Sequence, residues 1–114
     1  MDSHCLEQKE CSIFKISEIL KIGKSLASDA KTQEVYFVKG KITEISNTTY
    51  GNLTISDGTN SLYVYGTYSS DGRVRFDSLP QKPAVGDTVI LRGVIMNYKG
   101  SKVELYNSWL MKIE

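Results

Sequence analysis

Three glycines inside runs of alternating side chains constrain the fold of this chain more than any other feature. From residue 35 onward, apolar and polar residues alternate with a period of two, which is typical of strands with one buried face. Gly40, Gly66 and Gly93 fall on the buried side of three different runs. A glycine inside a strand weakens the sheet unless the strand bends sharply or another backbone comes close. Small barrels need such bends at their corners, so the glycines favour a closed β-barrel.

The spacing of strands and turns narrows the kind of barrel. Strand patterns cover residues 35–43, 52–56, 62–67 and 89–96, and a fifth begins at Val103. The longest break, residues 69–85, falls between the third and fourth strands, where the OB-fold carries its inserted segment. We therefore expect an all-β, β-rich chain with one short N-terminal helix, whose domain is a five-stranded OB-fold Greek-key barrel spanning residues 17–114.

The N-terminal region has a different pattern. Residues 1–16 are mostly polar and unpatterned, which predicts a tail. Ser17 is a suitable N-cap, and apolar residues then recur at helical spacing, so we expect a helix over residues 17–28 that docks on the barrel. Cys5 and Cys11 lie in the tail, where we expect free thiols, with a local disulfide as the alternative. Their spacing matches no zinc motif.

Charge and hydropathy exclude few partners. The formal net charge is +1, from 14 Lys and Arg against 13 Asp and Glu, so any basic patch must arise from placement rather than from the total. No apolar stretch approaches the roughly 20 residues of a membrane span. The first ten residues lack the pattern of a signal peptide, although the chain can still be the mature part of an exported protein.

Three segments also carry a resemblance to known domains. They are Tyr-Phe-Val-Lys-Gly-Lys-Ile at 36–42, Tyr-Gly-Asn-Leu-Thr-Ile-Ser-Asp at 50–57 and Gly-Asp-Thr-Val-Ile-Leu-Arg-Gly at 86–93, followed by Asn-Tyr-Lys-Gly at 97–100. Together they resemble a bacterial group of OB-fold domains that occurs in exported nucleases and in surface or secreted proteins, notably of Bacteroidetes. The resemblance covers about residues 17–113. It implies a nucleic-acid-binding domain in which a short helix precedes the first strand.

The residue types that carry catalysis are sparse. His4 is the only histidine and lies in the predicted tail, so we expect no histidine general base and no histidine metal site in the barrel. The aspartates at 57, 71, 77 and 87 occupy turn positions, where Asp bonds to its own backbone. No glycine-rich phosphate loop is present. We therefore expect a binding module rather than an enzyme, with no catalytic residues, metal or cofactor.

An outward face that combines rings and cations is the main functional feature of the predicted barrel. If the apolar residues of the first three strands point inward, the period of two turns their neighbours outward onto one surface. Single-stranded nucleic acids bind such surfaces, because bases stack on rings and cations track phosphates. OB-folds bind on the face of strands two and three, bordered by the loops between strands one and two and between strands four and five. The candidate nucleic-acid-binding residues are Phe37, Lys39, Lys41, Tyr50, Thr54, Tyr63, Tyr65, Arg73, Arg75, Tyr98, Lys99 and Lys102.

Structural explanations stand beside this one. Tyrosines are favoured in strands for packing alone, and a docked helix can cover part of the face. We expect Tyr36 and Trp109 to pack rather than to bind. The leading hypothesis is single-stranded DNA or RNA binding. The alternatives are a protein-interaction or structural accessory domain of an exported or envelope protein and, less favoured, oligosaccharide binding. The oligomeric state and the compartment stay open.

Overall fold

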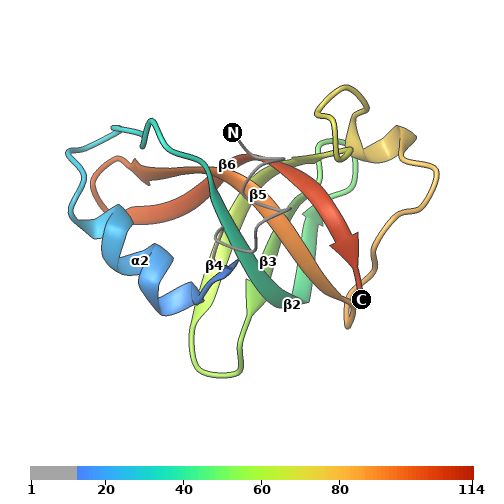
Figure 1. Ribbon diagram of the computed structural model, residues 1–114, viewed down its shortest axis with the longest axis horizontal. Helices are drawn as coiled ribbons and strands as arrows, with labels where there is room; N and C mark the ends of the chain where they lie inside the picture. Colours follow the sequence, from blue (N-terminus) through green and yellow to red (C-terminus); the bar gives the residue numbers. More distant parts are fainter. Residues whose placement is uncertain (1–12) are drawn as a thin grey trace.

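The computed structural model describes residues 13–114, which form a β-barrel with one α-helix (Figure 1). Most of the chain is in strands, as the alternating pattern predicts. The elements in chain order are β1 (Ile13–Phe14), α2 (Ile16–Lys24), β2 (Tyr36–Asn47), β3 (Asn52–Ser56), β4 (Ser61–Tyr68), the 3-10 helix η1 (Phe76–Ser78), β5 (Thr88–Tyr98) and β6 (Lys102–Ile113).

The barrel closes because β2 pairs with two different strands. Its first half, from Tyr36 to Lys41, runs antiparallel to β5, and its second half, from Lys41 to Asn47, runs antiparallel to β3. The remaining neighbours follow in the order β3, β4, β6 and β5, with β4 and β6 parallel. This is a closed five-stranded Greek-key barrel of the OB kind, and the predicted fold class is confirmed.

Two of the in-strand glycines stand where the barrel bends. Gly66 has a φ of +90°, in the left-handed region that side chains disfavour. Gly93 lies at a register shift between β5 and β6, and a Cβ there would be 3.1 Å from the carbonyl oxygen of Tyr106 and 3.3 Å from the Cα of Ser108. Both positions fit the prediction that these glycines serve bending and close approach.

The N-terminal predictions need correction. Ile13 and Phe14 are not a tail but the short strand β1, which runs parallel to β2 beside Phe37 and Val38. The helix begins at Ile16 after the N-cap Lys15, not at Ser17, and it ends at Lys24 rather than at residue 28. The backbone N–H of Lys15 donates to the carboxylate of Glu18 at 2.8 Å, which fixes this start. The predictions for His4, Cys5 and Cys11 concern residues outside the described range.

Helix α2 is part of the core rather than an appendage. Ile16 and Ile19 are buried in the same apolar cluster as the inward residues of the strands. A Cβ at Gly23 would overlap Val103 of β6, so the helix lies close against the barrel there. The aromatic ring of Tyr36 meets Phe14 edge-to-face at 5.1 Å and packs against the core, as predicted.

The segment between β4 and β5, like α2, contributes buried apolar residues to the core. Phe76 of η1 and the following Leu79 are buried, and a Cβ at Gly51 would overlap the ring of Phe76. Figure 1 shows α2 and η1 at opposite ends of the molecule. Apolar residues of α2 and of the η1 segment therefore cover the core from two sides. The strand side chains that do not point into the core lie on the outer surface of the barrel. Within residues 13–114, no helix has the length and apolar character needed to cross a membrane.

Truncating a core residue of α2 tests whether the helix belongs to the barrel. Ile19 is 0% exposed, so Ile19→Ala should lower the free energy of unfolding by about 2–5 kcal/mol through lost burial and a residual cavity. Urea unfolding followed by circular dichroism measures this change. The control is Lys21→Ala on the exposed side of the same helix, which should change it by less than about 0.5 kcal/mol. Equal small effects for both variants would mean that α2 is not integral to the core.

Candidate functional site

Aromatic rings gather on the outward face of β4 and β6. Parallel pairing sets Tyr65 opposite Tyr106 and Tyr68 opposite Trp109. The rings of Tyr65 and Tyr106 stack with their centroids 5.5 Å apart and their planes 9° from parallel. Tyr65 is nevertheless 46% exposed. The pairing of two strands that are distant in the sequence thus builds an open aromatic centre, which we call the tyrosine face (β4 and β6 from Tyr63 to Tyr68 and from Lys102 to Trp109).

Two hollows adjoin Tyr65 on this face. The central hollow has a volume of about 400 Å³ and is lined by Tyr63, Tyr65, Met96, Tyr98, Lys102, Glu104 and Tyr106. The side hollow has a volume of about 200 Å³ and is lined by Tyr50, Asn52, Tyr65, Gly66, Tyr68 and Asn107. Because Tyr65 lines both, the surface continues from the loop before β3 to the turn between β5 and β6.

A cation accompanies nearly every ring of this surface. Energetically significant cation–ring contacts occur about once per 70–80 residues in proteins. Here five contacts involve rings that lie on the tyrosine face or line its two hollows, so cations lie next to these rings although the whole chain is close to neutral. Measured from the Nζ or Cζ atom to the ring centroid, they are Lys102–Tyr63 at 3.7 Å, Arg92–Trp109 at 4.2 Å, Lys31–Tyr106 at 4.5 Å, Lys99–Tyr98 at 5.3 Å and Arg75–Tyr50 at 5.5 Å.

Most of the predicted site residues surround the two hollows. Thr54 of β3 stands opposite Tyr63 of β4 and is half-buried in the adjoining groove. The other residues that the structure brings to this surface are Tyr50, Tyr63, Tyr65, Arg75, Tyr98, Lys99 and Lys102. Arg75 is also paired with Asp77 through two hydrogen bonds of 2.8 Å, which satisfies much of its charge.

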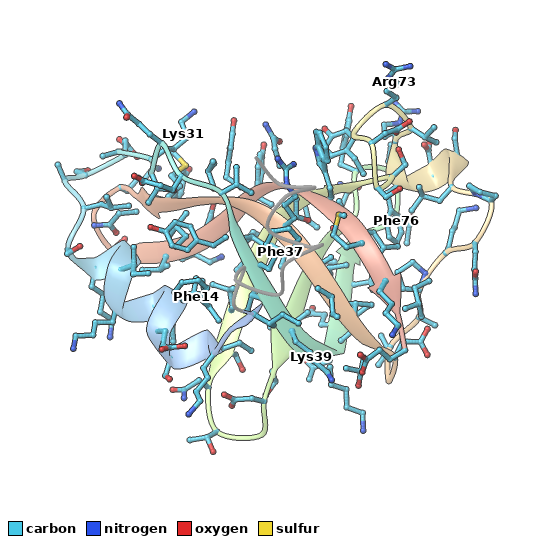
Figure 2. All side chains as sticks on the ribbon, in the orientation of Figure 1. Phe14, Lys31, Phe37, Lys39, Arg73 and Phe76 are labelled. Atoms are coloured by element: carbon cyan, nitrogen blue, oxygen red, sulfur yellow. The ribbon has the colours of Figure 1, made fainter. Side chains whose placement is uncertain are left out.

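Four predicted residues lie elsewhere. Phe37 is a correction, because it is 3% exposed rather than open to a ligand. It stands between Ile13 of the unpredicted strand β1 and Arg92 of β5. Lys39 and Lys41 line a different hollow beside β1, and the Nζ of Lys39 forms a 2.8 Å ion pair with Glu114. Arg73 projects away from the barrel at the tip of the loop after β4 (Figure 2).

Several residues of the surface were not predicted. Tyr106 and Glu104 are outward positions of β6, and the alternation from Lys102 onward carried that signal. Lys31 comes from the segment before β2, which bridges to Met96 of β5, and no local pattern indicated it. Trp109 packs as predicted, with Gly72 directly behind its ring and the Arg92 guanidinium over it.

Among the described residues that line the central hollow, Glu104 is the only acidic one. It is 5% exposed, and within the described residues no group donates a hydrogen bond to its carboxylate. Burial raises the pKa of this carboxyl, and the charge of Lys102 opposes that shift only in part. By contrast, hydrogen bonds lower the pKa values of Asp57 and Asp71, which lie in surface turns, and of Asp77, which lies in η1.

The chemistry of this surface is that of stacking and charge attraction. Residues 13–114 contain no group of three or more His, Cys, Asp or Glu side chains placed to hold a metal ion. A scan against protein-family models and a search of curated proteins both find no match to this chain. The resemblance to bacterial nucleic-acid-binding OB-fold domains therefore stays a prediction.

The buried carboxyl of Glu104 predicts a measurable pH effect. Because its pKa is raised on folding above the usual 4.5, the folded state holds this proton more tightly than the unfolded state does. Its contribution to stability is therefore lost as pH rises through the window above 4.5. Glu104→Gln removes that loss, so the variant should gain stability relative to the wild type as pH rises.

Urea unfolding at pH 4 to 8 measures the difference between the two proteins at each pH. The surface aspartates, whose lowered pKa values act with the opposite sign, are present in both proteins and cancel in this difference. Glu44→Gln, at an exposed carboxylate on β2, is the control for the chemical change. A difference that stays flat, or that falls with pH, would contradict the assignment.

Proposed function

We propose that this domain binds single-stranded nucleic acid on the tyrosine face. The observation that carries the proposal is the set of outward rings that each lie beside a Lys or Arg, with Tyr65 open between two hollows. A single-stranded nucleic acid can contact both kinds of side chain at once, because its bases stack on the rings and its phosphates attract the cations. A surface with rings alone or cations alone would favour only one of these.

The energetics of such a surface are adequate for binding. Stacking of a base on an aromatic side chain contributes about 1–3 kcal/mol, so two or three bases across the hollows would contribute about 2–9 kcal/mol. Micromolar affinity corresponds to about 8 kcal/mol, so contacts to phosphates must add to the stacking. Positive charge next to the rings comes from Lys31, Lys99 and Lys102, whereas Arg75 already forms an ion pair with Asp77. The near-neutral total charge predicts modest affinity that depends on local contacts.

Binding without catalysis is part of the proposal. The rings and cations that support it attract and stack, and they do not exchange protons readily near neutral pH. The place of the surface supports the proposal in part, because OB-folds bind oligonucleotides on barrel strands two and three between the loops after the first and fourth strands. The tyrosine face shares the third barrel strand, β4, and borders both loops, although its other strand is β6. That support is by analogy of fold, and the residues themselves carry the argument.

Substitution of the open ring tests the proposal. Tyr65→Ala should weaken binding of a mixed-sequence single-stranded DNA or RNA by about tenfold, because one stacking platform is removed. Fluorescence anisotropy in low salt measures the affinity, and unfolding curves confirm that the variant is folded. Lack of any binding by the wild-type chain at high micromolar concentration would overturn the proposal.

Substitution of a cation tests a separate part of it. Lys102→Gln should remove about one phosphate contact. The slope of the logarithm of the binding constant against the logarithm of the salt concentration should then fall in magnitude by roughly 0.7 for a single strand. Lys21→Gln, on the exposed side of α2, is the matched control and should leave the slope unchanged. Equal slopes for all three proteins would show that Lys102 does not meet a phosphate.

A protein partner is the second candidate function. Tyr50, Tyr65 and Tyr98 are between 40% and 48% exposed, and tyrosine is enriched in protein interfaces. If a second copy of the chain covers this face, sedimentation should reveal a concentration-dependent dimer that Tyr65→Ala weakens. If the chain stays monomeric at all accessible concentrations, self-association through the tyrosine face is excluded.

A further inference from the structure

The carboxylate of Glu104 forms no hydrogen bond or ion pair with the described part of the chain. It lies in the wall of the central hollow at 5% exposure, and no side chain or backbone group among residues 13–114 donates a hydrogen bond to it. The side chain is largely removed from water and has no hydrogen-bond donor, which costs stability, while its carboxylate oxygens are not fully enclosed and so can reach the hollow. Natural chains retain such groups chiefly at functional sites. A Leu or Thr at this outward position would fill the strand without that cost.

The groups around Glu104 leave its acceptor oxygens open to a ligand. Lys102, on the same strand, holds its ammonium 3.7 Å from the ring centroid of Tyr63, and it forms no ion pair with Glu104 within the described part of the chain. Tyr63 and Tyr65 face the hollow from β4, Met96 and Tyr98 face it from β5, and Tyr106 faces it from β6. The Nζ of Lys31 lies over the ring of Tyr106, 4.5 Å from its centroid.

We infer that Glu104 selects guanine within a bound single strand, an inference that rests on the proposed nucleic-acid function. A carboxylate has two acceptor atoms and no donor. The Watson–Crick edge of guanine places an N1–H and an N2 amino group side by side, so both can donate to one carboxylate. The rings that line the hollow would hold the base by stacking while the carboxylate reads this edge.

The other bases fit the carboxylate less well. Adenine and cytosine each present one amino group beside a ring nitrogen acceptor, and that acceptor would meet the second carboxylate oxygen. Thymine and uracil present one N–H between two carbonyl acceptors. Repulsion between acceptors therefore opposes all of these bases, and a phosphate is excluded for the same reason. The basic groups at the rim, Lys99 and Lys102, remain for the backbone.

A single-base substitution series tests this inference on the intact chain. The probe is a fluorescent ten-nucleotide oligothymidine that carries one central guanine, inosine, adenine, cytosine or thymine. Wild type should bind the guanine oligonucleotide about tenfold more tightly than the thymine one. Inosine, which keeps the N1–H but lacks the amino group, should fall between them. A single guanine also prevents quadruplex formation, which would confuse the comparison.

Two variants separate the carboxylate from the rest of the surface. Glu104→Gln should lose most of the guanine preference, because guanine loses the charged acceptor and thymine is relieved of the repulsion between acceptors. Glu44→Gln, the same change at an exposed outward carboxylate, should retain the guanine preference. Urea unfolding confirms that both variants are folded, and the inosine comparison needs no variant at all.

The outcomes distinguish this inference from the proposed function. If no oligonucleotide binds, the proposed function fails. If all bind equally, or if guanine preference persists in Glu104→Gln, nucleic-acid binding stands and the role of Glu104 is wrong. Preference for cytosine or adenine would also overturn guanine selection. Binding of a neutral oligosaccharide in place of every oligonucleotide would overturn both, because sugar hydroxyls can also donate to a carboxylate.

Discussion

The double pairing of β2, with β5 along its first half and with β3 along its second, is the constraint on which the rest of the structure depends. It closes the sheet, and closure gives every strand an inner face and an outer face. The inner faces make one core that also receives Ile16 and Ile19 of α2. The outer faces become the only place where the strands can present functional side chains. Both the stability of the domain and the location of its candidate site follow from this closure.

The sequence predicted the barrel well because its evidence is local and repeated. A period of two, in-strand glycines and a long break after the third strand each depend on neighbouring residues alone. The ends of the helix were harder, since Lys15 is an unusual N-cap and Ser17 a common one. Strand β1, of two residues, is too short to show any period, and Phe37, which pairs with it, is buried although its alternation predicted an open side chain.

The candidate site was predicted in part, and the failures share a cause. Tyr63 and Tyr65 were found because alternation in β4 exposes them. Tyr106 and Glu104 join them only because β6 pairs in parallel with β4, a contact that no local pattern reveals. Lys39 and Lys41 alternate outward as expected, yet the curvature of β2 directs them to another hollow. The period of two predicts whether a side chain points into the barrel or out of it. The closed strand order decides which outward side chains of different strands lie next to one another.

The central claim is that the tyrosine face is the ligand-binding surface. The most direct measurement is a titration of the ¹⁵N-labelled chain with mixed-sequence single-stranded DNA at low salt, followed by NMR. The account predicts amide shifts concentrated at Tyr63, Tyr65, Lys102 and Tyr106, with little change at Lys39, Lys41 and α2. Shifts confined to the hollow beside β1, or no shifts at high micromolar oligonucleotide, would contradict it.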